Sequence, residues 1–223
     1  GLGGFQLVCY AQNPGAGAVL RGRKRREGKA FAVMMQDAEA VRAFCEGGEA
    51  EKDSLTATQR PIVLLRKRPD AVFAPGLADA LPELGVMLPY TPLQHLPLHD
   101  LAKASGCAAR SSQREAEGSR AATAVPLLVM TSGNTHDEPI VIDDADSYEK
   151  LFAVADAFLG HARAIRARDD DPVVRVIEPG SAGATVPFIR RARGYAPLPL
   201  PMTAQTRDAQ AVSRDTTLRT PAC

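Results

Sequence analysis

The sequence predicts an α/β domain built on a mixed β-sheet with helices on its flanks. Short apolar runs of strand length recur along the chain and alternate with segments of helical pattern, which is typical of α/β folds. The 45% hydrophobic and 24% charged residues are ordinary for a globular protein, and no internal repeat is present. At 223 residues the chain can bury one sizeable core or two small ones.

Turn residues and helix caps divide the first part of the chain into six elements. Asn13-Pro14-Gly15 ends the first apolar run, and Asp37 has the residue type and the place of a helix N-cap. In chain order, we predict a strand over Phe5–Ala11, a helix over Ala16–Arg26, a strand over Ala30–Met35, helices from Asp37 through Cys45 and over Glu49–Thr58, and a strand over Pro61–Leu65. The last run is uninterrupted, which suits a strand covered on both faces.

The middle of the chain contains one strand, one short helix and an insertion. The strand is predicted over Leu84–Leu88 and ends at Pro89. Thr91 caps a short helix that Pro97 limits. From about residue 100 to 124 the composition changes to Ala, Ser, Arg, Glu and Gly, so we predict a mobile surface insertion.

The remaining strands are short. Leu127–Met130 is a strand, and Asp143-Asp144 starts a helix whose apolar residues have helical spacing. Those apolar residues are Tyr148, Leu151, Phe152 and Ala155. Further strands are expected over Ala157–Leu159, Val173–Ile177 and Val186–Ile189, with Pro179-Gly180 joining the last two. The domain is therefore expected over residues 1–200, followed by a disordered polar tail over 201–223.

Composition excludes several classes of protein. The net charge is +1, so no global field attracts nucleic acid or a membrane, and local clusters must hold any charged partner. Tryptophan is absent and aromatic residues are 5%, which supplies few side chains for stacking on single-stranded nucleic acid. The four cysteines are scattered, and neither a signal peptide nor a membrane-spanning run is present. We therefore expect reduced thiols and a cytoplasmic protein with no membrane partner.

Two distant segments are candidates for a shared binding site. A basic cluster comprises Arg21, Arg23, Lys24, Arg25, Arg26 and Lys29. Far downstream, Thr131-Ser132-Gly133-Asn134 follows the Leu127–Met130 strand. Fixed cations on one side, with hydroxyls and an amide on the other, could bind a phosphate-bearing nucleotide and a small carbonyl substrate. The alternatives are a solvated helix face for the basic cluster and an ordinary turn for the polar segment.

Two groups of charged residues near the C-terminal end each have two possible roles. Asp169-Asp170-Asp171 could gather Mg²⁺ or form a solvated turn. Arg190, Arg191 and Arg193 could close over a phosphate or mark a basic strand edge that discourages aggregation.

Six ordered segments make the chain resemble the YrdC-like domain of the HypF carbamoyltransferase family, which matures [NiFe] hydrogenases. The similarity covers most of residues 1–200. The matching segments are Gly1–Phe5, Arg23–Lys29 with Phe31–Met34, Arg60–Arg66, Leu84–Leu93, Met130–Asn134 with Asp137–Ile140, and Arg190–Pro197. The resemblance implies a YrdC-like twisted mixed sheet that lacks its first strand, since the family carries a helix and a strand before the residue matching Gly1.

The resemblance also implies an activity and its site. Family members join carbamate, released from carbamoyl phosphate, to AMP from ATP, and the carbamoyl group then passes to the partner HypE. By this analogy the catalytic residues are Lys24, Arg26, Ser132 and Asn134. From their residue types, we further predict that Lys29, Thr131, Arg190 and Arg193 bind nucleotide or phosphate, and Asp170 and Asp171 are candidate Mg²⁺ contacts. Pro172 stands where the family has Ser, which removes a hydroxyl and an N–H from this part of the site.

Three other functions remain open at this stage. Related YrdC domains make threonylcarbamoyl-AMP, so the chain could be an enzyme for that substrate. The basic cluster could instead bind double-stranded RNA, because YrdC-like domains resemble RNA-binding surfaces. The chain could also be an inactive remnant.

Overall fold

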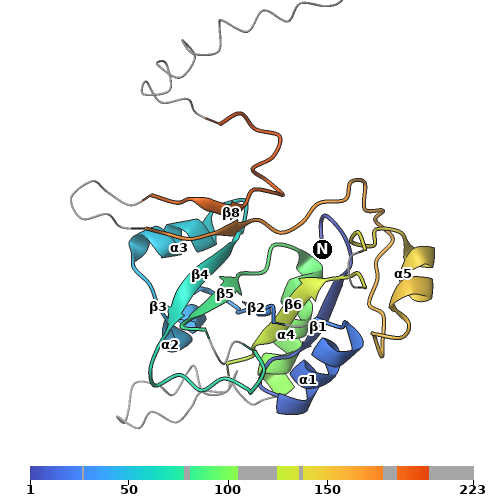
Figure 1. Cartoon of the computed structure of the whole chain (residues 1–223), viewed down its shortest axis with the longest axis horizontal. Coiled ribbons are helices and arrows are strands. Elements are labelled where there is room, and N and C mark those ends of the chain that lie inside the picture. Colours follow the sequence, from blue (N-terminus) through green and yellow to red (C-terminus); the bar gives the residue numbers. More distant parts are fainter. Residues whose placement is uncertain (27, 78–80, 105–124, 136–137, 178–184, 201–223) are drawn as a thin grey trace, which may run out of the picture.

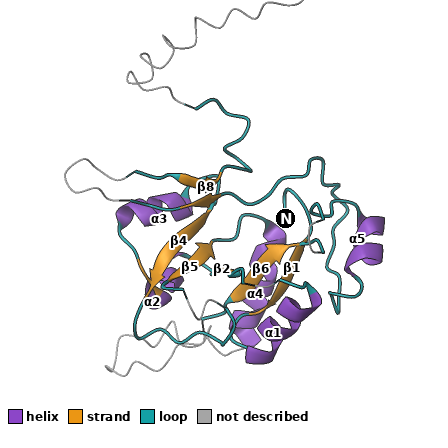
Figure 2. Cartoon of the chain, in the orientation of Figure 1, coloured by secondary structure: helices purple, strands orange, loops and turns teal. Residues whose placement is uncertain are grey.

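The computed structural model describes residues 1–26, 28–77, 81–104, 125–135, 138–177 and 185–200. In this part of the chain, a single mixed sheet forms the centre of the molecule and helices flank it, which confirms the predicted fold class (Figures 1 and 2). The helices are α1 (Pro14–Arg23), α2 (Ala38–Phe44), α3 (Glu49–Thr56), α4 (Pro92–Ala104) and α5 (Asp144–Leu151). The strands are β1 (Gln6–Tyr10), β2 (Ala32–Met34), β3 (Cys45–Glu46), β4 (Ile62–Lys67), β5 (Glu83–Met87), β6 (Leu128–Ser132), β7 (Val173–Val174) and β8 (Phe188–Arg190).

The polar segment begins within β6, because this strand extends past the predicted end at Met130 to include Thr131 and Ser132, and the strand order places it beside the start of β1. Within the described residues the order is β1-β6-β2-β5-β4-β7-β8, and β3 pairs with one end of β4. β2 is parallel to β5, and β4 is parallel to β7, whereas the β1–β6, β2–β6 and β4–β5 pairs are antiparallel. Because β1 and β6 are antiparallel, the C-terminal end of β6 meets the N-terminal end of β1, with Ser132 opposite Gln6.

Alternation along the strands divides the core between the two faces of the sheet. One face carries Val33, Val63, Val86 and Val129, which form a cluster with Leu20 of α1, Val41 of α2 and Leu55 of α3. The other face carries Met34, Met87, Leu128 and Met130, which pack with Leu98 of α4. Thus α1, α2 and α3 contribute to the core on one side of the sheet and α4 on the other.

Local capping explains where α1 begins and ends. The Asn13 side chain accepts hydrogen bonds from the N–H groups of Gly15 and Ala16, so the helix begins at Pro14, before the predicted Ala16. It ends at Arg23, because Arg25 has a φ of 50°, which lies in the left-handed region and cannot continue a helix. Asp37 caps α2 as predicted, by accepting a hydrogen bond from the Ala40 N–H.

The predicted short helix before residue 100 is wrong in length. α4 continues through Pro97 to Ala104, so the first residues assigned to the insertion are helical. Gln94 is buried, and its side chain accepts hydrogen bonds from the N–H groups of Tyr90 and Thr91, which satisfies two donors at the helix start. Residues 105–124 of the predicted insertion and the predicted tail over 201–223 lie outside the described residues.

Other departures occur where the apolar runs are short. The strand predicted over Ala157–Leu159 is wrong, because these residues form a loop. Of the four apolar residues predicted at helical spacing, Leu151 is buried and Ala155 packs on the core, whereas Tyr148 and Phe152 are 59% and 77% exposed, so the spacing identified the buried face only in part. β7 stops after two residues, and an isolated bridge between Ile177 and Thr185 replaces the rest of the expected pairing. The link at 179–180 lies outside the described residues.

The β1 edge of the sheet is open in the described part of the chain. Along β1, residues whose backbone groups bond to β6 alternate with residues whose backbone groups point away from it. Phe5 accepts a hydrogen bond from the Gly133 N–H, and Ala11 donates one to the Leu127 carbonyl, so the backbone groups of Gln6 and Val8 point away from β6. No described residue pairs with these backbone groups. Nor is any described helix long and apolar enough to cross a membrane.

Candidate functional site

Lys24 connects the two segments that the sequence identified as a candidate site, the basic cluster and residues 131–134. Lys24 is the C-cap residue of α1. Its side chain points into the protein, and only 5% of the residue is exposed. The Nζ atom donates to the carbonyl oxygen of Ser132 and to Asn134 Oδ1, the latter at 2.7 Å. Ser132 Oγ lies 3.3 Å from the same Nζ. The structure therefore joins the basic cluster to the polar segment at the end of β6 through a buried ammonium group.

The segment after β6 is fixed by further hydrogen bonds. Ser132 Oγ donates to Asn134 Oδ1 at 2.8 Å, and Asn134 Nδ2 donates to the Glu138 carbonyl at 2.6 Å. The Gly133 N–H donates to the Phe5 carbonyl at 2.7 Å, and a Cβ atom at position 133 would lie 2.7 Å from that same oxygen. Glycine is therefore required at position 133, because no side chain fits between β6 and β1 there.

Burial changes the ionisation of Lys24. Removal from water is the largest cause and lowers the pKa of Lys24 to about 8, and the nearby Arg26 lowers it further, whereas Asp170 acts in the opposite direction. The ammonium group is therefore present at neutral pH and is lost at moderately alkaline pH.

A cavity of about 400 Å³ lies beside Ser132, on the face of the sheet that α4 covers only in part. Its floor is apolar and is formed by Ala32 of β2, Ile62 and Leu64 of β4, and Gly85 of β5. The hollow exists because positions 32 and 85 carry almost no side chain, so the central strands lie uncovered at this point.

Two arginines face this cavity. Arg26 Nη2 donates to the Ala30 carbonyl at 3.1 Å, and the guanidinium lies 5.6 Å from the ring centroid of Phe31. Its Nε is buried and has no hydrogen-bond partner in the structure. Burial lowers the pKa of Arg26, as do the charges of Arg21 and Arg190. Converging cations with an unused donor form a site that an anion would stabilise.

Asp170 and Asp171 hold Arg190 at the cavity. Its Nε donates to the main-chain carbonyl of Asp171 at 2.9 Å, and its Nη1 lies 3.4 Å from Asp170 Oδ2. The Arg190 and Asp170 side chains are 45% and 46% exposed, so this ion pair is open to solvent.

We refer to Asp170, Asp171 and Arg190 as the arginine wall, and to Thr131 and Ser132, with Lys24 and Asn134 behind them, as the β6 wall.

The structure separates the predicted site residues into three groups. Arg26, Thr131, Ser132 and Arg190 line the cavity, as do the predicted magnesium contacts Asp170 and Asp171. Lys24 and Asn134 do not line it directly and hydrogen-bond to Ser132 from behind. Lys29 and Arg193 do not line it: Lys29 is exposed, and Arg193 pairs with Asp171 and lies over the ring of Tyr90 at 3.9 Å.

The residues that sequence reasoning missed are those of the cavity floor. Ala32, Ile62, Leu64 and Gly85 appear in the sequence only as members of apolar strands. The one available signal was a glycine in the middle of a buried strand, which often marks the close approach of a ligand or of another backbone.

The basic cluster offers little free surface for RNA. Arg21 donates to the carbonyls of Arg26, Lys29 and Gly76, and Arg23 forms an ion pair with Asp156 at 2.7 Å. Lys24 is buried, and Arg26 faces the cavity. Most of the cations that motivated the RNA hypothesis therefore contact other parts of the same chain.

The described residues contain no cluster of three or more His, Cys, Asp or Glu side chains able to hold a metal ion alone. Asp170 is a half-exposed carboxylate on the cavity. This arrangement fits the usual mode of Mg²⁺ binding, in which one or two carboxylates and the phosphates of a nucleotide share the ion.

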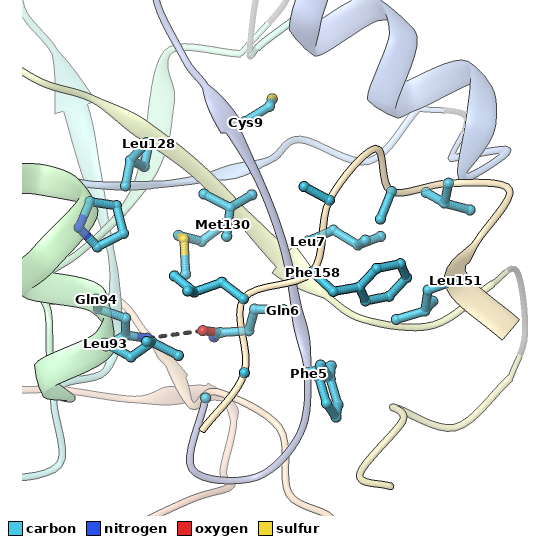
Figure 3. A pocket seen from close by; sticks show the side chains of 18 of the residues that line it. Phe5, Gln6, Leu7, Cys9, Leu93, Gln94, Leu128, Met130, Leu151 and Phe158 are labelled. Carbon is cyan, nitrogen blue, oxygen red and sulfur yellow. Dashed lines mark hydrogen bonds between the residues drawn. The ribbon is translucent and has the colours of Figure 1, made fainter. Parts of the chain in front are cut away.

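A second cavity of about 440 Å³ lies around β1 and is largely apolar (Figure 3). α1, α4 and the segment after α5 contribute side chains to it, including Leu20, Leu93 and Phe158. Its polar part contains Gln6 and Gln94, whose side chains are joined by a 2.9 Å hydrogen bond. Of the predicted site residues, none lines this second cavity.

Comparison with known proteins decides the family. The family model for Sua5, YciO and YrdC proteins, described as telomere recombination, matches residues 1–192. The chain belongs to the Sua5/YciO/YrdC family. This membership confirms the resemblance to a YrdC-like domain that the six sequence segments indicated.

Relatives and solved structures within this family are more specific. The chain is 47% identical over 199 residues to carbamoyltransferase HypF2 of Cupriavidus necator, an alignment that covers 88% of this chain and 23% of the relative. A crystal structure of full-length HypF in a phosphate- and nucleotide-bound form matches with a TM-score of 0.72 and 42% identity, over 88% of this chain and 22% of that one. A Sua5 structure from P. abyssi matches with a TM-score of 0.60 and 12% identity, over 86% of this chain and 48% of that one, which supports the fold alone.

The chain spans 22–25% of the length of the carbamoyltransferase relatives it matches. It corresponds to the part of those proteins that carries the YrdC-like fold. The chain is therefore related to enzymes of the carbamoyltransferase family.

Proposed function

We propose that the chain binds ATP in the cavity beside β6 and joins carbamate to AMP, as the adenylating part of a HypF-type carbamoyltransferase. The observation that carries this proposal is the contact of Lys24 with Ser132 and Asn134 at the edge of a cavity that Arg26 and Arg190 also face. The related full-length HypF has been solved in a phosphate- and nucleotide-bound form, which supports nucleotide binding as a property of such proteins.

The cavity provides different surfaces for the parts of the nucleotide. The apolar floor at Ala32, Gly85 and Leu64 is suited to the flat face of a base or to a ribose. Arg26 and Arg190 are suited to phosphate oxygens, because each guanidinium presents a planar set of donors. The β6 wall then accommodates the small acyl substrate beside the α-phosphate.

The proposed reaction forms one bond and breaks one. A carbamate oxygen attacks the α-phosphorus, the bond between that phosphorus and the bridging oxygen breaks, and pyrophosphate leaves with the electron pair. Negative charge is present throughout, so the fixed cations lower the barrier by stabilising charge without reorganising. Lys24 acts from behind Ser132 and orients its hydroxyl while providing positive charge at the acyl end of the site.

Mg²⁺ is part of the proposal as the counter-ion of the phosphates. Asp170 is the residue that would hold it, because its carboxylate is half exposed on the cavity. When bound, Mg²⁺ supplies charge neutralisation to the leaving pyrophosphate.

The steps before and after adenylation would need further components. Carbamate would come from carbamoyl phosphate through an acylphosphatase, and the carbamoyl group would continue to a HypE-like acceptor. We propose that these steps require parts of the longer relatives beyond the 22–25% that this chain covers, and the acceptor as a separate partner.

Isotope exchange between pyrophosphate and ATP tests the adenylation step directly. We expect exchange that requires carbamoyl phosphate, Mg²⁺ and an added acylphosphatase. Lys24→Ala should reduce the exchange rate at least tenfold, since a hydrogen bond to a charged group contributes about 1.5–3 kcal/mol. Lys29→Ala is the matched control, because it removes an exposed cation of the same cluster that does not line the cavity.

The same assay separates the proposal from its closest rival. Exchange that depends on threonine and bicarbonate, and not on carbamoyl phosphate, would assign the threonylcarbamoyl reaction instead. A folded chain that shows no exchange with either substrate would rule out adenylation by the chain alone.

A further inference from the structure

Asp171 lines the cavity beside β6 and joins four chain segments through its side chain. Its Oδ1 accepts hydrogen bonds from Tyr90 Oη at 2.9 Å and from Arg193 Nη2 at 3.1 Å. Its Oδ2 accepts a hydrogen bond from Gln6 Nε2 at 2.8 Å. These donors come from β1, from the segment after β5 and from the segment after β8. Both carboxylate oxygens are therefore engaged by the protein.

The surroundings make these hydrogen bonds strong and mutually supporting. The side chains of Asp171 and Arg193 are 18% and 11% exposed, so their ion pair is shielded from water. Burial and the charge of Asp171 raise the pKa of Tyr90, which keeps its hydroxyl protonated as a donor. Gln94 donates to Gln6 Oε1 at 2.9 Å and extends the network into the second cavity, where this contact is visible in Figure 3.

The same anchor determines where Arg190 lies. Arg190 Nε donates to the main-chain carbonyl of Asp171, the residue whose side chain the network immobilises. The Arg193 N–H donates to the Asp170 carbonyl at 3.2 Å, so the segment after β8 is attached to the acidic segment at both residues. Arg190 itself is half exposed, and its contact with Asp170 is long at 3.4 Å.

We propose that Asp171 is a positioning residue that holds Arg190 at the nucleotide cavity, and that Asp170 alone is the carboxylate available to ligand or metal. This inference rests on the proposed nucleotide binding. It divides the adjacent acidic residues into two roles, because the oxygens of Asp171 are occupied by Tyr90, Gln6 and Arg193.

Asp171→Asn disrupts the hydrogen bonds of the Asp171 carboxylate and keeps the size of the side chain. The new amide presents donors where a carboxylate accepted them, so it conflicts with Gln6 Nε2 or with the Tyr90 hydroxyl. The swap variant Gln6→Glu with Asp171→Asn restores a donor–acceptor pair between these positions at the same net charge. Tyr90→Phe is a milder break, because it removes one hydroxyl and keeps the ring over which Arg193 lies.

Affinity for α,β-methylene-ATP, measured by calorimetric titration, reports on Arg190. We expect Arg190→Ala to weaken binding about fivefold and Asp171→Asn to weaken it by a similar factor. The double variant should be weakened about fivefold and not about 25-fold, because both changes remove the same contact. The swap variant should recover to within about twofold of the wild type. Near-UV circular dichroism at the titration temperature establishes that each variant is folded.

Salt dependence distinguishes positioning from a general loss of structure. A fixed Arg190 contributes screened attraction to the phosphates, so Arg190→Ala should flatten the dependence of affinity on salt, and Tyr90→Phe, which weakens the anchor without changing the charge, should flatten it in the same direction. Multiplied losses in the double variant, or full affinity in Asp171→Asn, would overturn the inference. If Asp171→Asn does not fold, the same cycle is measured with Tyr90→Phe. A wild-type chain that does not bind the analogue would instead refute the proposed nucleotide site together with this inference.

Discussion

The β6 wall and the arginine wall border the same cavity and are held in contrasting ways. In the β6 wall, Lys24 is buried and contacts Ser132 and Asn134, at the end of a strand paired on both sides. In the arginine wall, Arg190 lies on a three-residue strand whose side chains are all exposed, and its position depends on the acidic residues 170 and 171. The first wall is therefore part of the core, whereas the second is attached to it.

This contrast separates stability from recognition. A change in the β6 wall should affect folding and ligand binding together, because the same atoms serve both. A change in Arg190, the exposed cation of the arginine wall, should affect ligand binding with little effect on folding. The following variants test that separation, in order of decreasing expected effect.

The largest effect is expected from Gly133→Val. Its Cβ would lie 2.7 Å from the Phe5 carbonyl oxygen, so the start of β1 would have to move away from β6. We expect a loss of about 3 kcal/mol in the free energy of unfolding, measured by chemical denaturation. Gly22→Ala is the control, because a Cβ at that helical position meets no atom within 4 Å and should stabilise α1 slightly. A Gly133→Val chain as stable as the wild type would show that the β6 wall is not part of the folding core.

The second effect is a dependence on pH that comes from Lys24. Its pKa of about 8 in the folded chain lies below the unfolded value of 10.5. The folded state therefore releases this proton first, so Lys24 makes the protein more stable as pH rises from about 8 towards 10.5. Over the same range the ammonium is lost, and affinity for the nucleotide analogue should fall by up to about tenfold per pH unit.

Lys24→Arg tests this assignment, because the guanidinium stays charged throughout the range. Titrations of the wild type and of Lys24→Arg from pH 7 to 10 should diverge above pH 8, with the variant nearly flat. Parallel curves would show that another group controls the dependence.

The smallest effect is expected from Arg190→Ala. The side chain is 45% exposed, so its loss should change the free energy of unfolding by less than about 0.5 kcal/mol. Affinity for the analogue should nevertheless fall about fivefold, because a contact to phosphate is removed. Arg166→Ala removes the same charge at an exposed position outside the cavity and should change neither quantity. A large loss of stability in Arg190→Ala would remove the distinction between the two walls.

The sequence predicted the β6 wall better than the arginine wall. Lys24, Ser132 and Asn134 could be chosen because their residue types follow a helix and a strand in a recognisable family order. The exclusion of Arg193 from the cavity and the anchoring contacts of Asp171 depend on segments that approach one another only in the folded chain. Such tertiary contacts leave no spacing pattern along the sequence.

The predicted elements failed where local signals competed with tertiary packing. Pro97 indicated a helix end, but α4 continues because its other residues pack on the sheet, with Leu98 buried. The apolar run Ala157–Leu159 resembled a strand, yet it lines the second cavity as a loop. The long strands β4, β5 and β6 were predicted well because their apolar runs were uninterrupted.

The floor of the cavity beside β6 owes its shape to two very small residues, Gly85 and Ala32. An added methyl group at position 85 would meet Ile62 Cγ2 at 3.0 Å, so this branched side chain would have to shift by a few tenths of an ångström to accommodate it. Such a change would make the cavity shallower without altering any cation or hydroxyl around its rim. Under the proposed nucleotide binding, the size of ring that fits this floor could therefore be engineered separately from the groups that contact the phosphates.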